Sequence, residues 1–232
     1  MAKSRTRSSE AFFGRRKGPP LQGRKQRVID ELLPELLIDP SKPVEGKLTD
    51  LFRDTFESIR LEIGFGGGEH LAQQAAANPE IGFIGVEPFI NGMAKMLCQI
   101  EDHGLTNVLL YNDDATQLLD WLPESSIAGI DLLYPDPWPK KRHWKRRFVN
   151  QTNLNRFERA IQSKGMFRFA SDIETYVNWT LNHTHRHGGF EWQAVSAEDW
   201  RKPWAGWLRT RYEAKAIREE RVPCYLCFQK TT

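Results

Sequence analysis

Short apolar runs alternate with helix-like segments from residue 59 onward, and this order constrains the fold more than any other feature of the chain. Runs that predict strands lie at 59–66, 81–88, 107–114, 129–136 and 165–172. Helical patterns separate them, at 69–78, 90–104, 116–121 and 150–163, and another follows residue 172. Such alternation predicts an α/β fold, with a mostly parallel sheet and helices on both of its faces.

The last two apolar runs, 190–195 and 222–229, have one helix candidate between them, at 210–219. We therefore expect these strands to pair antiparallel at one edge of the sheet. The second run contains Cys224 and Cys227. Residues three apart in a strand point to opposite faces, so this spacing predicts core packing and not a metal or redox site.

Length and composition predict one domain with an extension. Of the 232 residues, we assign 1–49 to a basic, flexible N-terminal extension and 50–232 to the domain. No apolar run approaches the roughly 20 residues of a membrane span, and the N-terminus lacks the apolar core of a secretion signal. The three cysteines suit a reducing compartment. We expect a cytoplasmic protein with no membrane contact. The histidines of "HTHRH" (183–187) lack acid or cysteine partners, so we expect no metal.

Carboxylates close the predicted parallel strands one after another. In open α/β sheets ligands bind outside the carboxyl ends of the strands, near the point where the strand order reverses. The acids at or near these ends are Glu62, Glu87, Asp113, Asp114, Asp136 and Asp172. The series predicts a polar binding site at that end of the sheet.

A glycine-rich turn, "LEIGFGGGEHL" (61–71), joins the first strand to the first helix. Gly64 and Gly66 let the backbone turn tightly and approach a ligand closely. No Gly-Lys-Ser/Thr follows, which disfavours ATP hydrolysis. Glu87, 21 residues after Gly66, is placed to accept hydrogen bonds from two ribose hydroxyls. Together these features predict a nucleotide-like cofactor.

The charges around this turn distinguish between two cofactors. A dinucleotide needs its pyrophosphate at the helix N-terminus, where Glu62 and Glu69 would repel it. S-adenosylmethionine carries a sulfonium and an ammonium, so acids favour it. Asp114 is placed to bind the adenine amino group.

The segment "YPDPWPKKRHWKRRF" (134–148) follows the fourth strand. Pro135 and Pro137 restrict the backbone around Asp136 and hold its carboxylate in place. A fixed carboxylate there can stabilise positive charge that develops as a methyl group arrives. Beyond it we expect a clamp for nucleic acid, with Trp138 or Trp144 stacking on a base. The cations that could hold phosphates are Lys140, Lys141, Arg142, Lys145, Arg146 and Arg147.

These motifs, with "NDDAT", "FASDIETY" and "TRYEAKA" in this order, resemble the bacterial tRNA (guanine-N7)-methyltransferase family over residues 50–232. The resemblance implies a Rossmann-like class I methyltransferase fold, S-adenosylmethionine as cofactor, and a guanosine in the variable region of tRNA as target. It implies cofactor contacts at Glu62, Glu87, Asp114 and Asp136, with Asp136 also the catalytic candidate. It implies substrate contacts at Lys140, Asp172, Thr210, Arg211, Tyr212 and Glu213. The motifs themselves add Gly64 and Gly66 on the cofactor side and Arg142 on the RNA side.

The predicted chemistry needs few groups. Guanine N7 has a lone pair and no proton, so methyl transfer requires neither a general base nor a cysteine nucleophile. Two alternatives stay open. "DPWP" is similar to the motif of adenine N6 enzymes, which methylate an exocyclic amine, and a non-catalytic RNA-binding module could keep the same fold. We expect no obligatory protein partner, and both a monomer and a homodimer remain possible.

The basic charge is concentrated at the N-terminus. Residues 1–27 hold nine Lys or Arg and one Glu, so this tail carries +8 and the rest of the chain −5. A basic tail on an acidic body suggests an electrostatic arm for a polyanion, the alternative being a solvated tail. Because the tail is distant in sequence from the glycine turn, we expect it to act on RNA and not on the cofactor.

Overall fold

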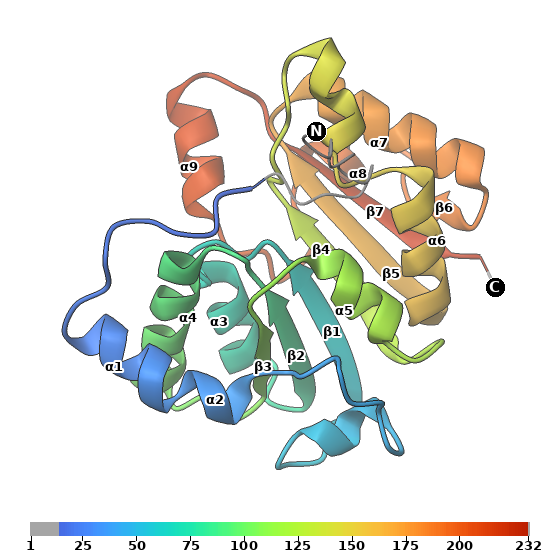
Figure 1. The fold of residues 1–232 in the computed structure, drawn as a ribbon. Helices are drawn as coiled ribbons and strands as arrows, with labels where there is room; N and C mark the ends of the chain where they lie inside the picture. The colour runs from blue at the N-terminus through green and yellow to red at the C-terminus, as the bar shows by residue number, and fades with distance from the viewer. Residues whose placement is uncertain (1–13, 232) are drawn as a thin grey trace, which may run out of the picture.

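The computed structural model describes residues 14–231, and their strands form one sheet (Figure 1). The strand order is β3-β2-β1-β4-β5-β7-β6. Strands β1 to β5 pair in parallel, and β7 is antiparallel to both β5 and β6. The strands are β1 (Ser58–Ile63), β2 (Ile81–Val86), β3 (Val108–Tyr111), β4 (Ile127–Leu133), β5 (Ile161–Ser171), β6 (Phe190–Trp192) and β7 (Cys224–Lys230). The predicted parallel sheet with an antiparallel edge is confirmed.

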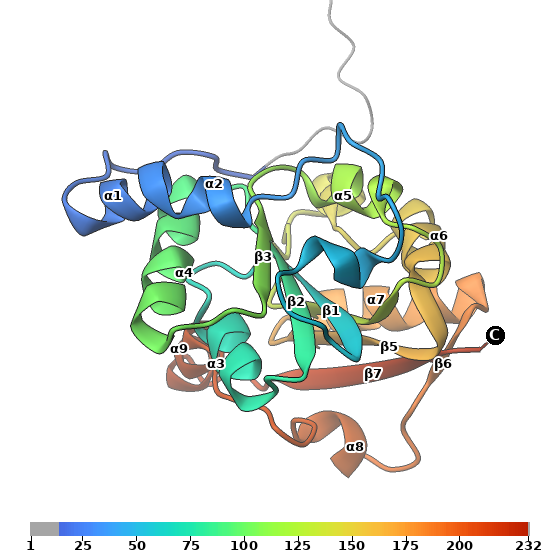
Figure 2. The ribbon, with the colours of Figure 1, turned by 90° about the horizontal axis from the view of Figure 1, so that it is seen from below.

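Helices cover both faces of the sheet (Figure 2). Neighbouring residues of a strand are therefore buried on opposite sides. On β2, Phe83 belongs to one buried cluster and Ile84 to the other. The first cluster includes residues of α1 (Arg24–Glu31), α3 (Glu69–Ala77) and α4 (Ile90–His103). The second includes residues of α5 (Ala115–Trp121), α6 (Gln151–Ala160) and α7 (Glu174–His187). The remaining helices are α2 (Leu33–Leu36), α8 (Glu198–Arg201), α9 (Arg211–Arg218) and the 3₁₀ turns η1 (Leu48–Leu51) and η2 (Lys141–Arg146).

Side-chain caps fix the start of three helices near the cavity. Asp114, Asn150 and Thr210 each accept a backbone N–H from the first turn of α5, α6 and α9. Such caps satisfy N–H groups that have no partner within the helix. The start of each helix is therefore fixed by the residue that precedes it.

Part of the expected N-terminal extension packs on the domain. In α1, Val28 is fully buried, and Arg24 donates to Glu101 of α4 from Nε to Oε2 at 2.9 Å. The N–H of Ile38 donates to the carbonyl of Leu110 in β3 at 2.8 Å. The apolar side chains of this segment are separated by many charged residues, so their helical spacing is hard to recognise in the sequence. The expected boundary at residue 50 therefore lies inside the packed region.

Two local expectations concern helix α6 and the cysteines of β7. Helix α6 ends at Ala160 and β5 begins at Ile161, so the helix expected to reach residue 163 is shorter. Cys224 and Cys227 both lie in β7, as predicted, and neither forms a disulfide. Between residues 14 and 231, no helix combines the length and apolar character needed to cross a membrane.

Candidate active site

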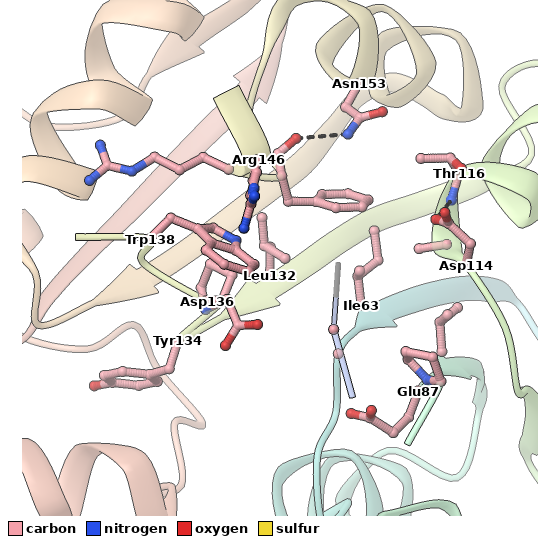
Figure 3. A pocket seen from close by; sticks show the side chains of 18 of the residues that line it. Ile63, Glu87, Asp114, Thr116, Leu132, Tyr134, Asp136, Trp138, Arg146 and Asn153 are labelled. Carbon is pink, nitrogen blue, oxygen red and sulfur yellow. Dashed lines mark hydrogen bonds between the residues drawn. The ribbon is translucent and has the colours of Figure 1, made fainter. Parts of the chain in front are cut away.

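A cavity of about 710 Å³ opens at the carboxyl ends of β1, β2 and β4 (Figure 3). It lies at the point where the strand order reverses, because the chain builds outward from β1 to β3 and then returns to place β4 on the other side. The cavity lining includes Gly64, Gly66, Glu87, Asp114 and Asp136, all of which were predicted as site residues. The structure therefore brings these five together.

Glu87 braces the glycine turn. Its Oε2 accepts the N–H of Gly66 at 2.7 Å, and its Oε1 accepts the N–H of Phe89 at 2.9 Å. Gly66 has a φ of +61°, and a Cβ on Gly92 of α4 would lie 2.2 Å from the Gly66 carbonyl oxygen. Only glycine permits so close an approach of helix and turn. Burial raises the pKa of Glu87 above its usual value, although these two hydrogen bonds oppose the change.

Asp113 and Asp114 follow β3, and their side chains have different partners. Asp114 lines the cavity and caps α5, with the N–H of Thr116 donating to Oδ1 at 3.0 Å. Asp113 lies at the rim, where Arg16 approaches its Oδ1 to 2.6 Å. Asp113 therefore anchors the N-terminal segment and Asp114 faces the ligand space.

The N-terminal segment forms one wall of this cavity. Gly14 and Arg15 belong to its lining. The segment is docked on the start of α4, where Asn91 accepts the N–H of Gly18 at 2.9 Å and donates to the carbonyl of Pro19 at 2.8 Å. The distance along the chain from which we expected the tail to act on RNA alone therefore does not hold in space for residues 14–20, and that expectation stays a prediction. Residues 1–13 lie outside the described part.

Asp136 projects into the cavity from the end of β4, on the side opposite Glu87 (Figure 3). The residues flanking its Pro-Asp-Pro turn, Tyr134 and Trp138, have φ values of +48° and +45°. Non-glycine residues rarely adopt this conformation, and such strain gathers at functional sites. Although the Asp136 side chain is open to the cavity, the surrounding protein excludes enough water to raise its pKa above the usual value.

Arg147 belongs to the cavity lining, but it is only 1% exposed and its guanidinium is engaged by the protein, so it is not available for phosphate. Its Nε donates to the Pro137 carbonyl at 2.9 Å and its Nη1 to the Thr175 carbonyl at 2.7 Å. Its guanidinium lies 4.5 Å from the centre of the Trp144 ring. The prediction that Arg147 holds phosphate is therefore wrong, and it instead braces the turn that carries Asp136.

Of the two tryptophans of the basic segment, one packs against another helix and the other lines the cavity. Trp144 packs against Trp179, with ring centroids 5.9 Å apart, on the side away from the cavity lining. Trp138 lines the cavity, and Arg146 lies over its ring at 4.9 Å from the centroid. Lys145, Arg146 and the buried Arg147 also line the cavity, whereas Lys140 and Arg142 are exposed outside it. Of these two tryptophans, Trp138 is thus the one that lines the cavity.

The remaining predicted residues are divided between cavity and interior. Arg211 and Tyr212 line the cavity from α9. Glu62, Thr210 and Glu213 are buried and do not line it, and Asp172 forms an ion pair with Arg221. Sequence reasoning missed Phe148 and the first turn of α6, which also line the cavity. The apolar side chain and the start of a helix gave no chemical signal that could have identified them.

Comparisons with known proteins agree with this geometry. Residues 57–225 match the model of a family described as "Putative methyltransferase". The tRNA (guanine-N(7)-)-methyltransferase of Agrobacterium fabrum strain C58 is 62% identical over 97% of both chains. The protein of that name from Rhizobium meliloti strain 1021 is 59% identical, again over 97% of each. This chain belongs to the tRNA (guanine-N(7)-)-methyltransferase family.

Solved structures place the fold of this family member among the class I methyltransferases. The 16S rRNA methyltransferase KamB aligns with a TM-score of 0.58 at 16% identity, covering 82% of this chain and 97% of that one. A second structure, described as an antibiotic-related methyltransferase, aligns with a TM-score of 0.55 at 15% identity, covering 83% and 98%. At such identities the likeness concerns the fold alone.

The cavity of this methyltransferase fits S-adenosylmethionine, the methyl donor of the family. Its volume lies within the range of small-molecule sites, roughly 300–1,000 Å³. Three carboxylates, those of Glu87, Asp114 and Asp136, line it, which suits a ligand that carries two positive charges. Burial removes water from the Glu87 carboxylate, so a nearby cation stabilises its charge more than it would stabilise an exposed carboxylate. These three carboxylates thus fit the charges of this cofactor.

Proposed function

We propose that this chain transfers a methyl group from S-adenosylmethionine to N7 of a guanosine in the variable region of tRNA, forming 7-methylguanosine. The observation that carries the proposal is the Asp136 carboxylate, held at a strand end in a cavity that both carboxylates and cations line, with Glu87 and Asp114 among the former and Lys145 and Arg146 among the latter. Close relatives that bear the name of this activity support it. The site explains how one chain can hold a cationic cofactor and a polyanionic substrate side by side.

The acidic side of the cavity would hold the cofactor. Gly64 and Gly66 let the backbone approach it, while Glu87 and Asp114 accept hydrogen bonds from its ribose and adenine. When bound, S-adenosylmethionine supplies an electrophilic methyl group. Glu87 also keeps the turn in shape through its bond to the Gly66 N–H. Glu62, which the resemblance assigned to the cofactor, lies beneath this surface and supports it from below.

The opposite side would present the guanosine. Trp138 offers its ring to the base, and Lys145 and Arg146 lie where phosphates of the same strand would pass. N7 needs no deprotonation, so the protein has to orient the base and exclude water. As the base becomes positively charged, the Asp136 carboxylate stabilises that charge across a short, poorly hydrated distance. Lys140 and Arg142, which are exposed, extend the basic surface for more distant phosphates.

The decisive experiment uses purified protein, tRNA and labelled S-adenosylmethionine. Label transfer followed by alkali-sensitive cleavage at one guanosine of the variable region would support the proposal. Digestion to nucleosides then distinguishes 7-methylguanosine from N6-methyladenosine by mass and retention. Cofactor binding without any methyl transfer would point to the non-catalytic module instead. A cytoplasmic location and the absence of an obligatory protein partner stay predictions, and both a monomer and a homodimer remain open.

A further inference from the structure

Helix α9 closes the cavity from the side of the glycine turn. A Cβ on Gly66 would lie 3.1 Å from Nη2 of Arg211 and 3.3 Å from the hydroxyl oxygen of Tyr212. The Tyr212 ring stacks on Tyr134, with centroids 6.4 Å apart and planes at 19°. Tyr134 begins the segment that carries Asp136. The helix therefore contacts both the glycine turn and the segment that carries Asp136.

The carboxylate of Glu213 holds this helix from within the protein. Glu213 is 5% exposed. Its Oε2 accepts the indole N–H of Trp207 at 2.7 Å, and its Oε1 accepts the hydroxyl of Tyr225 at 2.8 Å. Tyr225 lies in β7 and is 3% exposed, so it is out of reach of a large ligand. Both oxygens of Glu213 thus accept hydrogen bonds from within the protein, from the half-buried Trp207 and the buried Tyr225, and the exposed Arg209 approaches Oε1 to 3.9 Å.

The same contacts continue to the strand beneath the glycine turn. The Trp207 ring lies 5.2 Å from the His70 ring, centroid to centroid. His70 Nδ1 and Glu62 Oε2 are 2.8 Å apart, and both residues are buried. Glu62 precedes Gly64 by two positions in the chain. A series of side-chain contacts, buried except at the half-buried Trp207, therefore connects β1 to α9.

We infer that Glu213 is a positioning residue, which acts through α9 to set Arg211 and Tyr212 over the glycine turn and against Tyr134. This deepens the proposed function and rests on it, because it assigns a task within the same site. The resemblance placed Glu213 at the substrate. In the structure, the hydrogen bonds of its carboxylate are directed to Trp207 and Tyr225 instead. Glu62 is the other end of the same series of contacts.

The test compares Glu213→Gln, Tyr225→Phe and their double variant with the wild type. In Glu213→Gln, the amide N–H₂ would face either the Trp207 or the Tyr225 donor, so one of the two hydrogen bonds is lost. Tyr225→Phe removes the hydrogen bond from Tyr225 to Glu213, and RNA cannot reach this residue. We expect each single variant to lower the single-turnover rate at saturating tRNA and cofactor, Tyr225→Phe by about 3- to 10-fold and Glu213→Gln by more. The tRNA dissociation constant should stay within about twofold, because neither side chain touches the RNA. In the double variant the total effect should be smaller than the product of the single effects, since both act through one hydrogen bond.

A matched control separates positioning from plain stability. Thr184 in α7 is 2% exposed and donates to the Thr180 carbonyl, remote from the cavity lining. Thr184→Val removes this bond with little change in shape, so it should lower the melting temperature and leave the saturated rate unchanged.

Three results would overturn the inference. One is a wild-type rate for Tyr225→Phe together with a tenfold weaker tRNA affinity for Glu213→Gln, which would make Glu213 an RNA contact. Another is independent, multiplicative effects of the two changes. The third is an equal loss of rate in Thr184→Val. If the wild type itself methylates no N7, the proposed function fails first, and that outcome is distinct from all three.

Discussion

At the scale of single residues, Asp136 is the group on which the proposed reaction depends most. Its backbone is restricted by two prolines, by the positive φ values of Tyr134 and Trp138, and by Arg147 beneath the turn. So many restraints on one carboxylate are more than a connecting turn requires. A group aimed in advance at developing charge needs little reorganisation during the reaction, which is how such electrostatic catalysis works.

We predict that Asp136→Asn lowers methyl transfer by about 10²–10³-fold, equivalent to roughly 2.7–4 kcal/mol. The substitution keeps the size of the side chain and much of its hydrogen bonding but removes the charge. Single-turnover transfer at saturating tRNA and cofactor isolates this step, and tRNA affinity should stay near that of the wild type. A rate within twofold of the wild type would mean that Asp136 only shapes the turn.

The raised pKa values of Glu87 and Asp136 predict a pH dependence of cofactor binding. Each carboxyl takes up its proton at a higher pH than its usual value, 4.5 for Glu87 and 3.8 for Asp136. As the pH falls through these raised values, the negative charge that attracts the cationic cofactor is lost. Affinity should therefore decrease on acidification from neutral pH, before ordinary surface carboxyls titrate. Calorimetric titration from pH 7.5 to 5 measures this, and Asp136→Asn should make the dependence shallower.

The two sides of the cavity should respond to different substitutions. Glu87→Ala removes both a predicted ribose acceptor and the brace of the Gly66 N–H, so it should impair cofactor binding with little effect on RNA affinity. Lys140→Ala combined with Arg142→Ala should do the reverse, since both side chains are exposed outside the cavity. Titrations with each ligand alone decide the matter. Loss of the same ligand by both variants would contradict the assignment of the two sides.

At the scale of elements, the docked segment of residues 14–20 supplies Gly14 and Arg15 to the lining of the cavity. It lies on the start of α4, where Asn91 bonds to Gly18 and Pro19, and Asp113 holds Arg16. The Arg16 pair is half exposed, so alone it contributes little. The two bonds of Asn91 add to it, and together these contacts fix one wall of the cavity.

We predict that Asn91→Ala combined with Asp113→Asn raises the cofactor dissociation constant by about 3- to 10-fold, the scale of one to two net hydrogen bonds. The wall would detach more often and expose the ligand to water. Asp199→Asn is a suitable control, because Asp199 makes a similar cluster of surface hydrogen bonds outside the cavity lining. An unchanged dissociation constant in the double variant would show that the segment is not a functional wall.

At the scale of the whole molecule, the structure redistributes the basic charge that the sequence concentrates at the N-terminus. Arg24 and Arg27 pair with Glu101 and Asp102 on α4, so they are engaged in packing α1. Removing residues 1–27, a natural way to delete the tail, would also remove part of α1 and one wall of the cavity. The cleaner deletion covers residues 1–13, which carry Lys3, Arg5 and Arg7.

We predict that deleting residues 1–13 weakens tRNA binding and flattens its dependence on salt, while cofactor affinity is unchanged. Release of counterions gives a change in log–log slope of about 0.7–0.9 for each phosphate that the shortened protein no longer neutralises. Binding measured at a series of salt concentrations provides the slope. An unchanged slope would leave these three cations without a role in RNA binding.

The sequence by itself determined the sheet, the glycine turn and the series of acids at the strand ends. These features are local: apolar periodicity sets each strand, and an acid that follows a strand must lie at its carboxyl end. The spacing of Gly64, Gly66, Glu87, Asp114 and Asp136 along the chain was therefore enough to assign them to one site.

Tertiary structure alone decided which of several similar side chains are buried. Arg146 and Arg147 are neighbours in one basic run, but Arg147 is buried because Thr175, far along the chain, accepts its hydrogen bond. Glu213 belongs to the same short motif as Arg211 and Tyr212, yet Tyr225 of β7 draws its carboxylate into the interior. The docking of Gly18 on Asn91 is likewise a contact between residues that are far apart in the chain. Such choices depend on partners that only the folded chain brings within hydrogen-bonding distance.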